Sequence, residues 1–280
     1  MTARIAVVTV TFDTGETLRP LLQSIPAAAS VPVVTVVSDN GSRDVDLVRS
    51  IATEHGARFV VSGQNLGYGG GIRYGLSTID EDVEFVLVTN PDVVLEAGSV
   101  DRLLAAADRL PLGGSFGPRI VDEAGDVYPS ARRLPSLRTG IGHAAFSRVW
   151  PHNPWSQSYW AARETTDERT AGWLSGACVL VRRTAFDAIG GFDEGYFMYF
   201  EDVDLGARLG RAGWDNVYVP DAVVMHSGAH STSSNAKTME RVHHASAYRY
   251  LSRRYRGPLL WPVRLVLRVG LRVRGWWVTR

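Results

Sequence analysis

Ile5-Ala6-Val7-Val8-Thr9-Val10-Thr11-Phe12 is a short run of apolar and β-branched residues near the start of a chain of 280 residues. Such a run is typical of a strand that is buried on both faces of a sheet. Similar runs follow at residues 33–38, 58–62 and 84–89. Apolar residues at helical spacing separate these runs, at residues 17–25, 45–55 and 71–79. Repeated strand–helix units predict an α/β fold with a doubly wound, mainly parallel sheet.

The second half of the chain has a less regular pattern. It predicts, in order, a helix over 97–110, two short strands around a turn over 117–128, a buried strand over 172–181 and a last strand over 217–225. Periodicity is lost between residues 129 and 169, which we interpret either as a binding loop or as an insertion.

The bulk composition is that of a globular protein, with 45% hydrophobic and 21% charged residues. Cys178 is the only cysteine, which excludes a disulfide framework and a thiolate metal cluster within this sequence. No stretch of about 20 apolar residues is present, so we expect no membrane-spanning helix. The residues before the first strand are too few for a signal peptide, and we expect none.

The net charge of +1 hides an uneven distribution. Residues 241–280 contain ten arginines and no acidic residue, whereas the first 240 residues contain 20 basic and 29 acidic residues. Arg264, Arg268 and Arg272 are spaced by four, which places them on one side of a helix otherwise filled by leucine, valine and tryptophan. We therefore predict a basic amphipathic tail that lies on an anionic membrane surface. The alternative is a helix packed against the acidic body or against a second copy in a homodimer.

Polar and glycine-rich residues follow the first four predicted strands, at residues 9–13, 38–42, 65–71 and 89–92. Each turn has a plain structural interpretation, because asparagine, aspartate and glycine are common turn formers. A glycine-rich loop alone is also a weak sign of phosphate binding. Since parallel sheets bind ligands at the carboxyl ends of their strands, the four turns together predict a ligand site at this edge.

The stretch Phe197-Met-Tyr-Phe-Glu-Asp-Val-Asp-Leu205 holds the strongest catalytic candidate, Asp202. On a helical period Asp202 shares its stripe with apolar residues, namely Met198, Leu205 and Leu209. The neighbouring acids Glu201 and Asp204 fall on a second, charged stripe, which we expect to be solvated. A carboxylate on the inward stripe is either a helix cap or a catalytic group.

His226 ends the last predicted strand. A histidine in such a place is commonly a hydrogen-bonded surface residue. If His226 meets Asp92 across the edge of the sheet, however, the imidazole and the carboxylate form a divalent metal site with open positions for substrate oxygens.

Several of these stretches occur together in a known order. These motifs are Val8–Phe12, Ser38–Ser42, Asn65–Gly67, Asn90–Asp92, Gly190–Glu194, Glu201–Leu205 and His226. With these motifs, residues 4–230 resemble the inverting glycosyltransferases of family 2, which have the GT-A fold. The stretches at 172–176, 196–205 and 217–220 are similar to those of actinobacterial rhamnosyltransferases. Those enzymes transfer L-rhamnose from dTDP-rhamnose to N-acetylglucosaminyl-diphosphoryl-decaprenol, to build the linker between peptidoglycan and arabinogalactan in cell wall biogenesis.

The resemblance implies a role for each motif residue. On the donor side, the nucleotide would be lined or held by Thr9, Thr11, Asp39, Asn65, Gly67 and Asn90, with Asp39 accepting the pyrimidine N3–H. Asp92 and His226 would hold Mn²⁺ or Mg²⁺ at the diphosphate, and Asp202 would be the base. Two departures stand out: Asn90 replaces the first aspartate of the family's DxD motif, and Arg73 stands where related sequences often have asparagine.

The resemblance also implies how the chain is divided and where it works. Residues 1–240 would form the glycosyltransferase domain, with a nucleotide-binding half at 1–95 and a metal- and acceptor-binding half at 96–240, and residues 241–280 the tail. The partners would be dTDP-rhamnose, a polyprenyl-diphosphate-linked GlcNAc acceptor and the cytoplasmic face of the plasma membrane, without nucleic acid. Two alternatives remain: another family 2 enzyme with a UDP or GDP donor, or a non-catalytic protein that acts as a sugar-nucleotide sensor or membrane scaffold.

Overall fold

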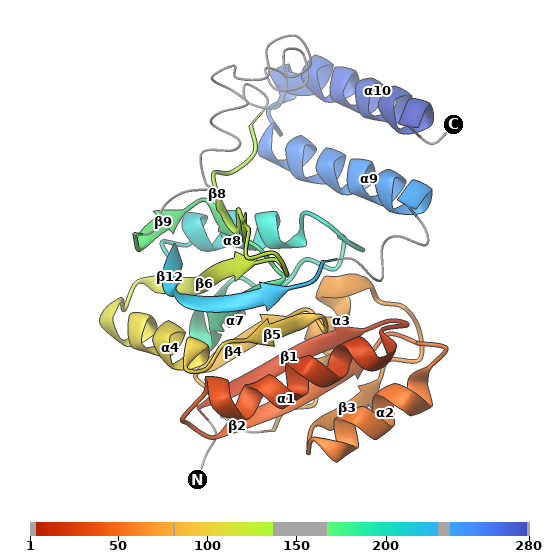
Figure 1. Ribbon diagram of the computed structural model, residues 1–280. Coiled ribbons are helices and arrows are strands. Elements are labelled where there is room, and N and C mark those ends of the chain that lie inside the picture. Colours follow the sequence, from red (N-terminus) through yellow and green to blue (C-terminus); the bar gives the residue numbers. More distant parts are fainter. Residues whose placement is uncertain (1–3, 81, 137–166, 229–235, 279–280) are drawn as a thin grey trace.

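The computed structural model describes residues 4–80, 82–136, 167–228 and 236–278, and Figure 1 shows them as a large sheet covered by helices. The first half alternates strands and helices as the sequence predicts. Its elements are β1 (Ile5–Thr11), α1 (Leu18–Ala28), β2 (Val33–Asp39), α2 (Val45–Glu54), β3 (Arg58–Val61), α3 (Gly67–Leu76) and β4 (Phe85–Thr89). All seven residues of β1 are buried, which confirms that this strand is covered on both faces.

The second half adds β5 (Val93–Leu95), α4 (Ser99–Arg109), β6 (Gly113–Val121), β7 (Val127–Tyr128), β8 (Ala131–Arg132), β9 (Arg169–Ala171), β10 (Trp173–Leu174), β11 (Cys178–Arg182), α7 (Arg183–Ala188), α8 (Glu201–Arg211) and β12 (Asp215–His226). The helix predicted over 97–110 and the strand pair predicted over 117–128 are confirmed. The run at 137–166, within the loop-like stretch, lies outside the described residues.

The main sheet has the strand order β3-β2-β1-β4-β11-β6-β12-β5. The strands β1 to β4 are mutually parallel, and β12 is parallel to β6, whereas β11 and β5 run antiparallel to their neighbours. The helices α1, α2 and α4 contribute to one hydrophobic core on one face of the sheet, and α3, α7 and α8 to a second core on the other. The mainly parallel, doubly wound α/β fold is therefore confirmed.

The buried strand predicted over 172–181 is two strands. β10 pairs with β8 in a small separate sheet, and β11 pairs with β4 and β6 in the main sheet. The three residues between them, Ser175 to Ala177, make the change of sheet. The single apolar run predicted one strand because both pieces are buried, and the break between them depends on different, distant pairing partners.

The glycine-rich stretch after β3 is also not a loop, because α3 begins at Gly67 and includes Gly69, Gly70 and Gly71. Side chains on these glycines would collide with neighbouring elements. A Cβ at Gly69 would come within 2.9 Å of the Cβ of Phe192, and one at Gly71 within 2.9 Å of Val10. The glycines thus let a helix approach β1 and the 190–197 segment closely, at a cost in helix propensity.

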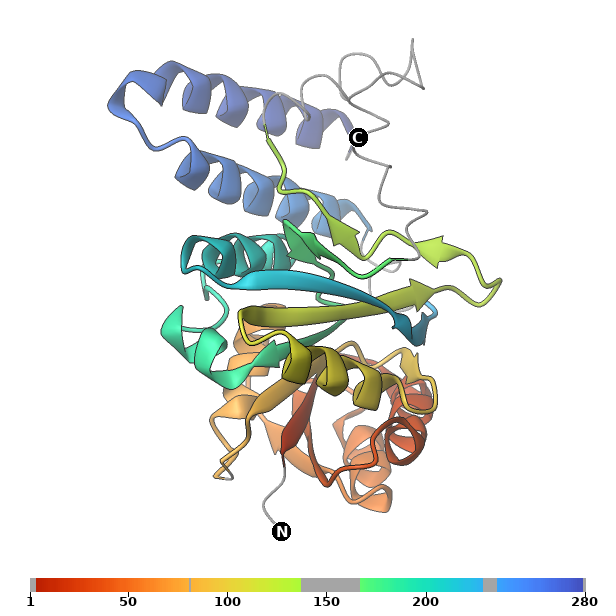
Figure 2. The same cartoon turned by 90° about the vertical axis from the view of Figure 1, so that its left-hand side faces the viewer.

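The tail forms a pair of helices, α9 (Ala236–Arg254) and α10 (Trp261–Val278), joined by the short turn η3 (Pro258–Leu260). Figure 1 shows α9 above α8 and α10 as the outermost element, and Figure 2 shows the same order from the side. Arg249 of α9 donates to Asp193 at 2.9 Å, and Arg253 forms a second ion pair with the same carboxylate. The tail helices are therefore anchored to the body through α9.

Candidate active site

The carboxyl ends of β1 and β2 bring three predicted nucleotide-side residues together. Thr9, Thr11 and Asp39 have no exposed surface, and the Thr11 hydroxyl donates to Oδ2 of Asp39 at 2.9 Å. The Thr9 hydroxyl has no hydrogen-bond partner in the described part of the chain. A buried polar atom without a partner costs free energy, so Thr9 is a candidate contact for a bound group.

Asp39 is the centre of a buried hydrogen-bond network. Its Oδ1 accepts the backbone N–H groups of Gly41 and Ser42 at 3.0 and 2.9 Å, and its Oδ2 accepts the hydroxyls of Thr11 and Ser42. Both oxygens therefore already have two donors each. Reaching the N3–H of a pyrimidine would require one of the two hydroxyls to turn away, so the role of Asp39 in base recognition stays a prediction.

The entry to α3 carries Asn65 and Gly67. Oδ1 of Asn65 accepts the N–H of Gly67 at 2.9 Å, and the side-chain amide of Asn40 donates to the Gly67 carbonyl at 2.8 Å. Gly67 has φ +74°, and a Cβ there would collide with the carbonyl oxygen of Phe197. Asn40 is a buried residue that the sequence did not single out, although it stands inside the motif at 38–42. These contacts tie the nucleotide edge to the segment that precedes α8.

The candidate metal residues lie together at the edge of the sheet. Oδ1 of Asp92 and Nε2 of His226 are 3.1 Å apart, and the side-chain amide nitrogen of Asn90 is 3.2 Å from the same Nε2. Asp92 and His226 meet at this edge because β12 runs antiparallel to β5 and pairs His226 with Val93, and their role as metal ligands stays a prediction. Two neighbouring ligands of an octahedral ion, each about 2.1 Å from it, lie about 3 Å apart. The spacing of these two atoms therefore fits a divalent cation.

The carboxyl group of Asp92 is in its ionised form at neutral pH. Burial by itself raises the pKa of Asp92, but the hydrogen bond and the charge of His226 outweigh it, so the pKa is lowered overall. An ionised carboxylate is the form that binds Mg²⁺ or Mn²⁺. Among the described residues no group of three or more histidine, cysteine, aspartate and glutamate side chains gathers, so substrate oxygens and water would complete the coordination.

Asp202 lies in the first turn of α8 and is half-buried. Its Oδ2 accepts the backbone N–H of Gly176 at 3.0 Å, and its Oδ1 accepts the N–H of Val203 at 2.8 Å. Burial raises the pKa of Asp202, and these two N–H groups and the charge of Arg132 offset part of that rise. A carboxylate with a raised pKa, held in place by backbone donors, is suited to accept a proton.

The prediction that Glu201 and Asp204 are solvated is wrong, since they are 7% and 4% exposed. Asp204 forms an ion pair with Arg208 at 2.6 Å, as its helical spacing suggests, but this pair is itself buried. Val203 and Ala207 of α8 pack with Trp173 and with Tyr250 of α9, so α8 is covered on this side as well. The tail therefore covers this side of α8 at Val203 and Ala207.

Glu201 has an unusual environment next to the candidate base. Its Oε2 is buried without a hydrogen-bond partner among the described residues. Burial, and then the charge of Asp202, raises the pKa of Glu201 to about 8. Glu201 is therefore largely protonated at neutral pH, so the two adjacent acids carry about one negative charge, which we assign to Asp202.

Two residues that sequence reasoning missed connect the base to the metal residues. The Tyr68 hydroxyl donates to the carbonyl of Gly176 at 2.6 Å, while the N–H of Gly176 is bonded to Asp202. The next carbonyl, that of Ala177, accepts the N–H of Asn90 at 2.8 Å. The loop between β10 and β11 therefore contacts both parts of the site. Tyr68 stands among the α3 glycines, and that position was its only signal in the sequence.

These features agree with a comparison against known families. A family model described as "Glycosyltransferase like family 2" matches residues 3–245. The chain belongs to this family. The glycosyltransferase is 45% identical to the N-acetylglucosaminyl-diphospho-decaprenol L-rhamnosyltransferase of Mycobacterium tuberculosis, over 98% of this chain and 94% of the relative. It is also 28% identical to rhamnosyltransferase WbbL of Escherichia coli, over 78% of this chain and 82% of the relative.

Solved structures with a similar fold are glycosyltransferases as well. The mannosyltransferase PcManGT from Pyrobaculum calidifontis, in complex with GDP-Man and Mn²⁺, superposes with a TM-score of 0.60 at 15% identity and covers 100% of this chain and 72% of that one. GalNAc-T7, with UDP, GalNAc and Mn²⁺, gives a TM-score of 0.57 at 15% identity, over 92% of this chain and 52% of that one. The GT-A fold expected for this glycosyltransferase is thereby confirmed.

Proposed function

We propose that this chain transfers L-rhamnose from dTDP-rhamnose to N-acetylglucosaminyl-diphospho-decaprenol, with inversion at the sugar carbon. The observation that carries the proposal is the identity of 45% with the mycobacterial L-rhamnosyltransferase, which extends over 98% of this chain. It is supported by the presence, in one connected site, of a candidate base and a pair of candidate metal ligands.

In this proposal Asp202 is the base. An inverting transfer needs one group to take the proton of the acceptor hydroxyl, and it needs no protein nucleophile. Asp202 has a raised pKa and is oriented by the N–H groups of Gly176 and Val203. General base catalysis of this kind contributes about 10²–10⁴-fold to the rate. Glu201, protonated beside it, keeps the site from carrying a second negative charge.

Asp92 and His226 would hold a divalent cation, Mn²⁺ or Mg²⁺, at the diphosphate of the donor. When bound, the ion acts as a Lewis acid on the leaving group. Asn90, in place of a second carboxylate, lies 3.2 Å from His226 and supplies an amide rather than a charge. An imidazole ligand favours Mn²⁺ over Mg²⁺.

On the donor side we assign Thr9, Thr11, Asp39, Asn65, Gly67 and Asn90 to the nucleotide. Support comes from their common position at the carboxyl ends of β1 to β4 and at the start of α3. The N-terminal end of a helix favours negative charge, so the start of α3 suits a phosphate group. Asp39 would be the group that recognises the pyrimidine, after the Thr11 or Ser42 hydroxyl turns away from it.

The acceptor is lipid-linked, so we propose that the tail, residues 241–280, brings the glycosyltransferase domain, residues 1–240, to the cytoplasmic face of the plasma membrane. Among the described residues, no helix has the length and apolar character needed to cross a bilayer. Exposed apolar side chains gather on and just before α10, namely Leu259, Trp261, Leu265, Val266 and Val269. Such a face, on an arginine-rich helix, suits the lipid interface.

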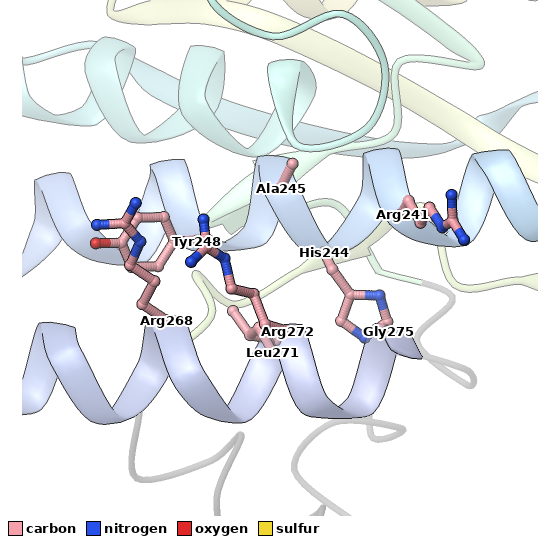
Figure 3. Close-up of a pocket in the computed structure, with 8 residues that line it drawn as sticks. All are labelled: Arg241, His244, Ala245, Tyr248, Arg268, Leu271, Arg272 and Gly275. Atoms are coloured by element: carbon pink, nitrogen blue, oxygen red, sulfur yellow. The ribbon is translucent and has the colours of Figure 1, made fainter. Parts of the chain in front are cut away.

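The arginine row of α10 lies on one side of the helix, as its spacing predicts, and Arg268 and Arg272 of that row are exposed. Arg264 donates to the carbonyls of Tyr255 and Gly257, both at 2.9 Å, and so fixes the turn between the helices. Arg268 and Arg272 point toward α9 (Figure 3). The outer face of α10 carries apolar side chains, so membrane contact would combine hydrophobic insertion of this face with the attraction of exposed arginines to anionic lipid.

The experiment that tests the proposed function is a transfer assay. Purified protein is incubated with Mn²⁺, a synthetic GlcNAc-diphosphoryl-polyprenol and one donor at a time from a panel of dTDP-, UDP- and GDP-sugars, and the products are read by mass spectrometry. We expect one deoxyhexose to be added from dTDP-rhamnose alone. Transfer of a hexose from a UDP or GDP donor would replace the proposed donor, and no transfer from any donor would contradict the proposal.

A further inference from the structure

The two tail helices border an open cavity of about 510 Å³ that is separate from the candidate active site. Arg241, His244 and Tyr248 line it from α9, and Arg268, Leu271 and Arg272 line it from α10. Figure 3 shows His244 of α9 and Arg268 and Arg272 of α10 extending into the space between the two helices. Neither the donor nor the acceptor chemistry discussed above uses these residues.

The lining of the cavity combines apolar surface with three arginines. None of Arg241, Arg268 and Arg272 is paired with a carboxylate of the described residues, unlike Arg249 and Arg253, which share Asp193. Arg268 and Arg272 are also four residues apart on one helix, where like charges repel. Three guanidinium groups around one hollow leave a positive charge that an anion would neutralise.

One acidic residue adjoins this lining. Oε1 of Glu240 lies 3.5 Å from Nδ1 of His244, and the Glu240 carbonyl oxygen lies 2.7 Å from the same nitrogen. Within the described residues Glu240 therefore contacts His244 and forms an ion pair with none of the three arginines. The sequence supplies no other acid nearby in the tail, because residues 241–280 contain no aspartate or glutamate.

α9 separates this cavity from the candidate base. On its side toward the body, Ser246 donates to the carbonyl of Met198 at 2.8 Å, and the His243 ring lies 5.4 Å from those of Tyr199 and Phe200. The segment 198–200 leads directly into α8 and Asp202. The cavity lining is on the other side of α9, toward α10, so a ligand there would not compete with the donor.

We propose that this cavity binds the phosphate group of a membrane lipid headgroup. Guanidinium groups bind phosphate through paired hydrogen bonds, and the Tyr248 hydroxyl adds a further donor. The same helix favours a membrane lipid as the molecule that carries the phosphate. The apolar outer face of α10 presents Val266 and Val269, which are 70% and 53% exposed. The choice of a lipid rests on the proposed membrane contact, whereas phosphate binding itself does not require it.

The test uses the full chain and a soluble lipid. Monomeric dihexanoyl phosphatidic acid is titrated into the protein by calorimetry in the presence of EDTA, which removes any metal-dependent binding at Asp92 and His226. We expect saturable binding with one site. The double variant Arg268→Gln/Arg272→Gln should weaken it by about tenfold or more, because two charge-assisted contacts are lost. The matched control Arg256→Gln changes an exposed arginine outside the cavity and should alter affinity less than about twofold.

A second variant tests the same cavity independently, in case the double arginine variant does not fold. Ala245→Glu places a carboxylate in the cavity at an exposed position of α9, and it should also abolish binding. Unchanged affinity in both the arginine and the Ala245 variants, or an equal loss in Arg256→Gln, would overturn the site. Inorganic phosphate that binds as tightly as phosphatidic acid would overturn the lipid as its source. Because these measurements involve neither sugar transfer nor Asp202, their failure is distinguishable from failure of the proposed function.

Discussion

Gly176 donates its backbone N–H to Oδ2 of Asp202 at 3.0 Å. This contact joins the candidate base to the loop between β10 and β11, and the following residue of that loop, Ala177, accepts the N–H of Asn90. Asp202 and Asn90 come from widely separated parts of the sequence, yet one short loop is hydrogen-bonded to both. Their relative position is therefore set by backbone hydrogen bonds rather than by side-chain packing alone.

The buried network around Asp39 gives the first prediction. Asp39→Asn replaces one accepting oxygen by an amide that faces two donors, so we expect a loss of about 1–3 kcal/mol of stability. Urea unfolding without nucleotide measures it. The control Asp46→Asn changes an exposed carboxylate that pairs only with Arg49 in the described residues, and it should cost less than about 0.5 kcal/mol. Equal stability of both variants would mean that the network does not hold this edge of the sheet.

Glu201 gives a prediction on pH. Its pKa is raised from 4.5 to about 8 in the folded protein, so between these values the folded state holds a proton that the unfolded state has released. The contribution of Glu201 to stability is therefore present below about pH 4.5 and falls as pH rises to about 8. Glutamine does not titrate, so the Glu201→Gln variant does not lose stability in this way. The free energy of unfolding of the variant minus that of the parent should therefore be larger at pH 9 than at pH 6. Urea unfolding at both pH values measures the change; a difference that does not vary with pH would contradict the assignment.

The metal site gives a prediction on cofactor removal. Activity should be lost in excess EDTA and return with Mn²⁺ more fully than with Mg²⁺. Asp92→Ala and His226→Ala should each lower metal-dependent turnover by about 10²-fold or more, since a Lewis acid supplies several kcal/mol. Asp221→Ala, at an exposed position of the same strand as His226, is the control and should retain activity. Full turnover in EDTA would show that no metal is needed.

How far the sequence predicts this fold depends on how local each signal is. The strands and helices of the first half were predicted because their apolar spacing is a local property, as the buried run of β1 shows. The break at Ser175 to Ala177 was missed because it depends on which strands β10 and β11 pair with. The helical glycines of α3 were taken for a loop because the close approach of Val10 and Phe192 that requires them is tertiary.

The same limit applies to the site. The types of Asp92, His226 and Asp202 pointed to their chemistry, and the sheet topology brings the first two within 3.1 Å as expected. The burial of Glu201 was missed, because the periodicity of α8 alone does not reveal which tertiary contacts cover that side chain. Tyr68 contributes one hydroxyl and Gly176 one peptide group. Contacts of this kind cannot be predicted from the residue type alone.

The tail gives a prediction on membrane binding. The protein should co-sediment with anionic vesicles at low salt and be released at high salt. The double variant Val266→Glu/Val269→Glu places charge on the outer face of α10 and should abolish co-sedimentation. Leu112→Glu, at a position of similar exposure (65%) outside the tail, should leave it unchanged.

Truncation after Gly257 extends this test to catalysis. It should reduce turnover on a full-length lipid acceptor far more than on a short soluble analogue. Equal loss on both acceptors would instead make the tail a part of the folded enzyme, and vesicle binding that survives both the truncation and the double variant would contradict the membrane role of α10.

The most direct test of the central claim is the turnover of Asp202→Asn with dTDP-rhamnose and a lipid-linked GlcNAc acceptor. The amide keeps the size of the side chain but cannot accept the proton, so kcat should fall by about 10²–10⁴-fold while dTDP binding stays within about twofold of the parent. Glu201→Gln, which imitates the protonated neighbour, should retain most of its activity. A kcat of Asp202→Asn close to that of the parent would contradict the assignment of Asp202 as the base.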